Sequence, residues 1–170
     1  MPERGASAVV VPVPEAEPVV AAWRARLDPR AAVGMPAHVT ALYPFLDEPR
    51  LTPEVTRRLA AVCAGLPVLD VEFRCFGRFP GVLYLAPEPA DGLRRLTLAI
   101  VEEWPEAPPY GGAFDTIVPH LTLADSREPD PGLEAEVRRA LPIRVRLPEA
   151  ELLVFDGRRW QRRARLPFRP

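Results

Sequence analysis

The stretch GMPAHVTALYPF, residues 34–45, contains one of the two histidines in this chain of 170 residues. The other histidine lies in IVPHLTLA, residues 117–124. In both stretches a threonine follows the histidine by two positions, which gives the pairs His38 and Thr40, and His120 and Thr122. The chain has only six threonines, so random placement would produce both pairs with a probability of about 0.1%. A single histidine on an apolar strand is more often structural than catalytic, but the repetition favours a shared function.

Both stretches have the composition of β-strands, because β-branched and apolar residues surround each histidine. Residues two positions apart on a strand point to the same side, so each histidine shares a face with its threonine. An imidazole carries a proton near neutral pH, and a hydroxyl donates a hydrogen bond. Displacement at phosphorus needs a base for the attacking group and an acid for the leaving oxygen, on opposite sides. Two such strands facing each other would supply both groups, with the threonines donating to the phosphate oxygens.

The rest of the chain alternates strand and helix patterns. Amphipathic spacing, capping residues and terminal prolines or glycines predict helices at residues 17–28, 51–65, 91–105 and 130–141. Alternating or β-branched stretches predict strands at residues 7–14, 37–45, 69–76, 82–87, 115–124, 143–147 and 151–168, the last with a hairpin turn at Asp156-Gly157. Frequent hairpins favour an α+β fold with antiparallel sheets over a doubly wound parallel sheet. A strand and a helix precede each histidine strand, at residues 8–42 and 82–124, which indicates two similar halves within one domain of residues 1–170.

Composition is that of an ordinary globular protein, with 48% hydrophobic and 26% charged residues. No apolar stretch approaches the roughly 18 residues of a membrane span, and the N-terminus lacks the pattern of a signal peptide. We therefore expect a cytoplasmic protein with no membrane partner, and buried reduced thiols at Cys63 and Cys75. Residues 1–137 carry 12 arginines and 20 acidic residues, net −8, whereas residues 138–170 carry 10 and 3, net +7. The basic segment is equally consistent with a phosphate-binding surface and with the solvated face of strands.

Other catalytic arrangements find less support in the sequence. Neither histidine has a second ligand on its own strand, and the cysteines and the aspartates near the histidines show no metal-ligand spacing. The two serines lie outside any nucleophile-elbow motif, and no glycine-rich phosphate loop is present. We therefore expect neither a metal nor a cofactor.

The segments HVTALYP and HLTLA begin 82 positions apart and resemble the paired H-x-T motifs of the 2H phosphoesterase superfamily, in its 2′-5′ RNA ligase (LigT-like) branch. The first motif of this family runs H-x-T-x-x-x-P, and Pro44 is in the matching place. The resemblance extends over residues 7–168 in the order of elements. It implies a bilobed, pseudo-two-fold symmetric α+β fold with two antiparallel-rich sheets, helices packed outside, and one motif from each lobe in a central cleft.

The resemblance also implies a mechanism. Members of the family act without metal on 2′,3′-cyclic phosphates or 2′-5′ linkages of RNA or small nucleotides. Carried over by position, His38 and His120 are the acid–base pair, and Thr40 and Thr122 bind the phosphate. The analogy makes His120 the base and His38 the acid, an order that the sequence itself does not decide.

Further residues are candidates for substrate contact. Arg78, in the GRFPG turn, is a candidate phosphate contact. Tyr110 and Phe114, in the loop before the second motif, would either stack on a base or anchor a surface loop. Tyr43 and Phe45 should lie on the strand face opposite His38 and pack in the core. A C-terminal arginine run fits an amphipathic strand first and an RNA-binding track second: Arg158, Arg159, Arg162, Arg163 and Arg165.

These observations lead to a functional hypothesis. We expect a monomeric, metal-independent phosphodiesterase that hydrolyses the 2′,3′-cyclic phosphate of an RNA end or a small cyclic nucleotide, with 2′-5′ ligation as the reverse activity. Two alternatives stay open. One is a non-catalytic nucleotide- or RNA-binding module, and the other is a phosphodiesterase for another substrate, such as an ADP-ribose cyclic phosphate or 2′-5′ oligonucleotides. Because both histidine–threonine pairs are intact, the sequence favours catalysis over binding alone.

Overall fold

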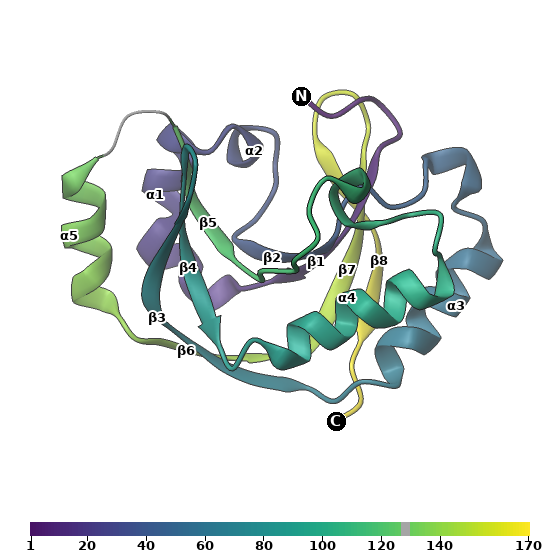
Figure 1. Cartoon of the computed structure of the whole chain (residues 1–170). Helices are drawn as coiled ribbons and strands as arrows, with labels where there is room; N and C mark the ends of the chain where they lie inside the picture. The colour runs from purple at the N-terminus through teal and green to yellow at the C-terminus, as the bar shows by residue number, and fades with distance from the viewer. Residues whose placement is uncertain (127–129) are drawn as a thin grey trace.

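Two four-stranded antiparallel sheets form the framework of the protein (Figure 1). The computed structural model describes residues 1–126 and 130–170. In the first sheet the strand order is β2 (His38–Leu42), β1 (Ser7–Pro12), β7 (Glu149–Phe155) and β8 (Trp160–Pro167). In the second sheet the order is β5 (Leu121–Asp125), β4 (Val82–Glu88), β3 (Leu69–Phe79) and β6 (Ile143–Leu147). The predicted α+β class with antiparallel sheets is therefore confirmed.

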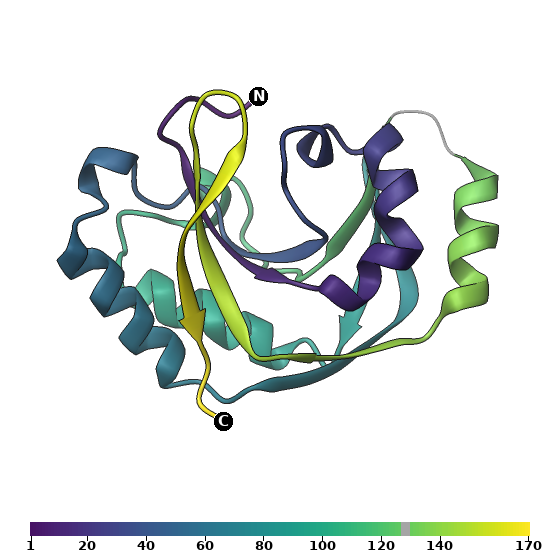
Figure 2. The same cartoon turned by 180° about the vertical axis from the view of Figure 1, so that it is seen from behind.

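The helices of the described residues are α1 (Glu17–Leu27), α2 (Pro29–Ala32), α3 (Pro53–Ala64), α4 (Asp91–Glu103) and α5 (Pro131–Ala140), with 3-10 turns η1 (Pro14–Ala16), η2 (Glu48–Arg50) and η3 (Pro109–Gly112). Helices α3 and α4 pack against the first sheet, and α1 and α5 lie beside the second (Figures 1 and 2). The predicted caps are present, since Thr52 accepts from the backbone N–H of Val55 at 3.2 Å and Asp130 from that of Gly132 at 3.0 Å. No helix in the part of the chain that the structure describes is long and apolar enough to span a membrane.

The two halves of the fold have the same plan. The unit β1–α1–β2 corresponds to β4–α4–β5, and in each unit the second strand is the edge strand of its sheet. Each helix crosses to the other sheet, because α1 packs against β5 and α4 packs against β2. The two edge strands, β2 and β5, contact each other. This confirms the two similar halves predicted at residues 8–42 and 82–124, and it brings the two histidine motifs together.

Strand β1 is buried on both faces. Val9 and Val11 belong to the main hydrophobic core, which extends between the sheets and their helices. Ala8 and Val10 face the other way and pack in a smaller cluster with Met35, Leu153, Phe155 and Trp160. A strand with two buried faces appears in sequence as a continuous apolar run rather than as an alternation, which accounts for the segment SAVVVP.

Two local predictions were wrong. Cys75 is exposed, although Cys63 is buried as predicted. A β-bulge in β3 inserts one extra residue between Phe73 and Cys75 relative to β4, and this breaks the alternation that placed Cys75 inside. The strand predicted at 115–124 begins only at Leu121, so that His120 lies immediately before β5 rather than within it.

Candidate active site

The two histidines make the same hydrogen bond in the two halves of the protein. His38 Nδ1 lies 2.6 Å from the carbonyl oxygen of Pro36, and His120 Nδ1 lies 2.8 Å from that of Val118, in each case two residues back. A carbonyl oxygen only accepts hydrogen bonds, so Nδ1 donates and carries the hydrogen of the neutral ring. The lone pair of Nε2 in each ring is then left to accept a proton.

Each threonine lies on the same side of its sheet as its histidine. Thr40 Oγ1 is 3.1 Å from His38 Nε2. Thr122 is opposite Tyr84 in the β4–β5 register, and the ring of Tyr84 lies 5.3 Å from the ring of His120, centroid to centroid. Cross-strand partners share a face, so Thr122 and His120 lie on one side of the second sheet. Because β2 contacts β5, the four predicted residues belong to one region of the molecule.

Aromatic rings surround His120. Phe79 meets the imidazole edge-on at 5.1 Å between centroids, and Tyr84 packs on it from the next strand. The Tyr84 ring also covers Gly77, where a Cβ would lie 2.2 Å from Tyr84 Cζ, so only glycine permits this packing. Burial lowers the pKa of His120 because the imidazolium would lose hydration; the charge of Arg30 lowers it further, against the opposing hydrogen bond to the backbone.

His38 is the more buried of the two histidines, with 8% of its surface exposed. Burial lowers its pKa from 6.5 to about 4, and the positive charges of Arg24 and Arg30 act in the same direction. The Pro36 carbonyl and Asp28 oppose this shift without cancelling it. Since the pKa of His120 is lowered too, both rings are mainly neutral at neutral pH in the free protein. A bound phosphate anion would raise both pKa values and allow one ring to hold a proton.

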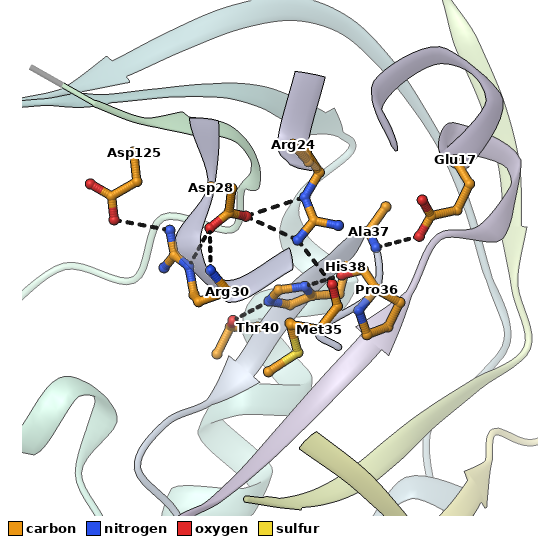
Figure 3. A network of polar contacts seen from close by, with 10 residues as sticks. All are labelled: Glu17, Arg24, Asp28, Arg30, Met35, Pro36, Ala37, His38, Thr40 and Asp125. Carbon is orange, nitrogen blue, oxygen red and sulfur yellow. Dashed lines mark hydrogen bonds and ion pairs between the residues drawn. The ribbon is translucent and has the colours of Figure 1, made fainter. Parts of the chain in front are cut away.

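A buried ion-pair network that was not predicted from the sequence lies beside His38 (Figure 3). Arg24 and Asp28 each have 2% of their surface exposed, and Arg24 Nη2 lies 2.9 Å from Asp28 Oδ2. Arg24 also donates to the carbonyl of Met35 at 3.2 Å, which fixes the segment that leads to His38. Arg30 Nε donates to the other oxygen of Asp28 at 2.9 Å. Burial alone would raise the pKa of Asp28, but the two guanidinium groups outweigh it and lower the pKa.

One signal for this network was present in the sequence. Arg24 and Asp28 are four residues apart, which is the spacing of an ion pair on a helix. The sequence does not indicate that the two side chains are buried, because their burial depends on how the segment between α2 and β2 folds back over them. Helix α2 was not predicted either; it begins where Asp28 accepts a hydrogen bond from the backbone N–H of Arg30 at 3.1 Å, and it carries Arg30 toward the histidines.

A pocket beside Thr40 is formed by the end of β2 and the loop that precedes the second motif, with Tyr43, Tyr110 and Phe114 in its wall. The backbone N–H of Tyr110 donates to the carbonyl of Tyr43 at 2.6 Å, and this bond ties the loop to the end of β2. Tyr110 has a φ of 52°, an unusual conformation for a bulky residue. Its ring meets that of Phe114 edge-on at 5.8 Å, and Phe114 remains 69% exposed. Two aromatic side chains that were candidates for base stacking therefore lie next to Thr40.

The predicted core positions at the end of β2 divide between two environments. Phe45 is buried in the main core, as predicted. Tyr43 is only half-buried, and it packs beside the smaller cluster and lines the pocket instead. The prediction that Tyr43 lies in the core was wrong, because a β-bulge between Thr40 and Leu42 shifts the alternation of faces. Leu42 therefore faces the main core, and Tyr43 faces the smaller cluster on the other side.

Arg78 and three of the C-terminal arginines contact glutamates rather than the histidines. Arg78 lies within β3 rather than in a turn, and its guanidinium pairs with Glu134 of α5. Its neighbour Phe79 faces His120, so Arg78 faces the other side of the sheet. Three arginines of the run form ion pairs with glutamates, namely Arg162 with Glu151, Arg163 with Glu48 and Arg165 with Glu149. These contacts favour the amphipathic-strand interpretation of the run.

The assembled groups suit a small anion between two proton carriers. Each half contributes an Nε2 that can accept or donate a proton and a hydroxyl that can donate a hydrogen bond. The guanidinium of Arg30 adds a positive charge close enough to act on both imidazoles. Over residues 1–126 and 130–170, no group of three or more His, Cys, Asp or Glu side chains is placed to hold a metal ion.

The fold and the repeated motif define a protein with one H-x-T unit in each of two similar halves. Residues 11–159 match the sequence profile of the 2′-5′ RNA ligase superfamily, and the chain belongs to this superfamily. No protein with curated function matches the chain.

Solved structures share the fold. The crystal structure of E. coli LigT complexed with 3′-AMP has 20% sequence identity and a TM-score of 0.64, covering 98% of this chain and 99% of that one. A crystal structure of a phosphoesterase has 18% identity and a TM-score of 0.63, covering 99% and 100%. A protein of Thermus thermophilus has 20% identity and a TM-score of 0.64, covering 95% and 97%. The LigT-like fold predicted from the motifs is thereby confirmed.

Proposed function

We propose that the protein is a metal-independent phosphodiesterase that opens the 2′,3′-cyclic phosphate of an RNA end or a small nucleotide. The observation that carries this proposal is the repeated geometry of the histidines. One comes from each half, and each has Nδ1 bonded to a backbone carbonyl and Nε2 available for proton transfer. Membership of the 2′-5′ RNA ligase superfamily supports an activity of the 2H phosphoesterase type.

In the proposed reaction, one neutral histidine takes a proton from water at Nε2 while the water oxygen bonds to phosphorus. The bond between phosphorus and one ribose oxygen breaks, and the second histidine, protonated at Nε2, gives its proton to that oxygen. The product is a phosphomonoester beside a free hydroxyl. Thr40 and Thr122 donate to the non-bridging oxygens, where negative charge increases. The family analogy assigns His120 as the base and His38 as the acid.

Exposed aromatic side chains on the loop near Thr40 support a nucleotide as the substrate. Tyr43, Tyr110 and Phe114 offer aromatic surface next to the proposed phosphate position, and such rings stack on bases of any sequence. E. coli LigT has been crystallised with 3′-AMP, which supports a nucleotide ligand for this fold. If the 5′-hydroxyl of a second RNA end takes the place of water, the same ring opening would form a 2′-5′ bond, because the bond between phosphorus and the 3′ oxygen breaks and that oxygen takes the proton.

Hydrolysis of 2′,3′-cyclic AMP and of a short RNA ending in a cyclic phosphate, both in EDTA, tests the proposal. His38→Ala and His120→Ala should each lower kcat by about 100-fold or more, because each removes one half of the proton transfer. Cys75→Ala is the control, since its exposed side chain should leave the rate unchanged. A wild type that binds both compounds without turnover would favour the binding-module alternative. Activity that survives both histidine substitutions would overturn the mechanism.

A further inference from the structure

Arg30 lies between two carboxylates at the edge of the candidate site (Figure 3). Its Nε donates to Asp28 Oδ1 at 2.9 Å, and its Nη2 donates to Asp125 Oδ2 at 3.2 Å. The Asp28 side chain is fully buried, whereas 47% of the Asp125 side chain and 39% of the Arg30 side chain are exposed. Asp28 is therefore a fixed anchor, and Asp125 is a partner that water or another anion can replace.

The charge of Arg30 is not neutralised within the buried network. Arg24 and Arg30 share the single carboxylate of Asp28, so these three side chains carry a net positive charge. Asp125 balances that charge only from the exposed side. Burial is the main cause of the lowered pKa of both histidines, and the charge of Arg30 lowers both pKa values further, so Arg30 lies within electrostatic reach of both imidazoles. An anion bound between the histidines would therefore lie within the field of Arg30.

We propose that Arg30 binds a non-bridging phosphate oxygen of the substrate, through the part of the guanidinium that Asp125 occupies in the free protein. This inference rests on the proposed phosphodiesterase function, and it adds a cationic phosphate ligand to the two histidine–threonine pairs. A guanidinium binds phosphate oxygens through charge-assisted hydrogen bonds, and the bond to Asp28 holds it in a fixed orientation.

The proposal gives Asp125 a role in the reaction cycle. Substrate phosphate displaces the Asp125 carboxylate, which competes with every anion for Arg30. A cyclic phosphodiester carries one negative charge and the phosphomonoester product carries up to two, so Asp125 repels the product more strongly. Asp125 thereby promotes product release, and Arg30 promotes substrate binding.

Calorimetric titration of inorganic phosphate into the full chain tests this competition without turnover. Arg30→Gln should weaken phosphate binding about 10-fold or more, because the cation is lost. Asp125→Asn should tighten it about 3-fold or more, because the competing carboxylate is lost while the side chain keeps its size. Arg26→Gln is the matched control. It removes a nearby arginine, but Arg26 stacks on Trp23 at 5.1 Å, and Trp23 in turn bonds to α5, so phosphate affinity should equal that of the wild type.

The Asp125→Asn variant separates phosphate binding from a merely structural role of Arg30. If the ion pair with Asp125 only stabilised the fold, its loss would leave phosphate affinity unchanged or weaken it, and either result would overturn the proposal. Unchanged affinity in Arg30→Gln, or a wild type without measurable phosphate binding, would overturn it as well. Arg30→Lys keeps the charge but not the forked donor geometry, and its affinity should fall between those of the wild type and Arg30→Gln.

Turnover of 2′,3′-cyclic AMP is measured separately in the same variants. If the wild type hydrolyses the cyclic nucleotide but phosphate affinity is the same in the wild type and in Arg30→Gln, the phosphate-binding inference fails and the proposed function stands. If the wild type is inactive but phosphate affinity follows the expected order, the proposed function fails and the phosphate site at Arg30 stands. If both hold, Asp125→Asn should also increase inhibition by the phosphomonoester product.

Discussion

The hydrogen bond at Nδ1 determines which nitrogen of each histidine can exchange a proton. Pro36 and Val118 hold the two rings by the same contact, so Nε2 is the nitrogen left for proton exchange in both halves, with the Thr40 hydroxyl beside that of His38. Burial then favours the neutral form of each ring. The protonation of these two rings therefore determines two measurable properties, the pH dependence of the rate and the pH dependence of stability.

The rate should depend on pH as a bell whose maximum lies on the acidic side of neutrality. The reaction needs one neutral and one protonated histidine, and the population of that state peaks midway between the two pKa values. In the free protein the pKa of His38 is about 4 and that of His120 is lowered from 6.5, so kcat/KM for 2′,3′-cyclic AMP should be greatest below pH 6.5. The two limbs of the pH profile of kcat should lie at higher pH than those of kcat/KM, because bound phosphate raises the pKa values of both histidines. A flat profile from acid to neutral pH would contradict two-histidine catalysis.

Stability should decrease as the pH is lowered, through the neutral burial of His38. Its pKa is about 4 when folded and near 6.5 when unfolded, so the unfolded state binds an extra proton in that window. Its contribution to the free energy of unfolding is complete above 6.5 and is lost as pH falls toward 4, amounting to about 3 kcal/mol. Urea unfolding at both ends of the window should show a smaller pH dependence in His38→Gln than in the wild type. Equal dependence in both proteins would refute the neutral burial of this ring.

The residues of the site were only partly predictable. The pairing of His38 with Thr40 follows from a period of two along a strand, which is local information. The same spacing indicated His120 and Thr122, although His120 lies just before β5.

Arg30 and its anchor Asp28 do not follow from such a spacing, because their position depends on a short helix and on pairing across the fold. The side of the sheet on which Arg78 lies could not be predicted for a related reason. Strand β3 continues through the segment that was predicted to be a turn, and this continuation determines the orientation of Arg78.

At the scale of elements, the β3–β4 hairpin supports the second histidine. Strand β3 extends to Phe79, and the two strands bring Phe79 and Tyr84 against the ring of His120. Gly77 makes this possible, because the Tyr84 ring occupies the space that a side chain would need. The absence of a side chain at Gly77 in β3 therefore helps to determine the orientation of the His120 ring, through Tyr84.

Gly77→Ala should impair both stability and rate. The new Cβ would lie 2.2 Å from Tyr84 Cζ, so the ring must move away from its contact with His120. We expect a loss of about 1–3 kcal/mol in the free energy of unfolding and a lower kcat/KM. In Gly77→Ala with Tyr84→Ala the clash is absent, and the loss should be smaller than the sum of the single losses. Cys75→Ala, exposed on the same strand, should change stability by less than about 0.5 kcal/mol. Additive losses would indicate that the ring does not fill this space.

Element boundaries followed the sequence where the pattern was regular. The capped helix at Thr52 and the hairpin at Asp156-Gly157 have local signals of their own and were found. The bulge that exposes Cys75 was missed, because one added residue in a strand leaves no mark in the sequence. The late start of β5 was missed because Pro119 and its neighbours are apolar but lack a paired strand.

At the scale of the whole molecule, the crossing of α1 and α4 connects the two halves. Each helix belongs in sequence to one half and packs against the edge strand of the other half, so each sheet loses one of its helices if the other half unfolds. The main core is continuous between them, since it includes Val9 and Leu152 of the first sheet together with Phe73 and Leu121 of the second. We therefore propose that residues 1–170 form one cooperative domain with two lobes.

Unfolding in urea should then be a single transition for both lobes. Trp23 on α1 donates to Glu136 of α5 at 2.9 Å and reports on the second lobe, whereas the buried Trp160 of β8 reports on the first. In variants that keep only one of these tryptophans, with phenylalanine at the other tryptophan positions, the fluorescence midpoint should coincide with that variant's own circular-dichroism midpoint. Calorimetric and van't Hoff enthalpies should agree in the wild type. Two separated midpoints would mean that the lobes open independently, and the histidines would then be held together only while both lobes are folded.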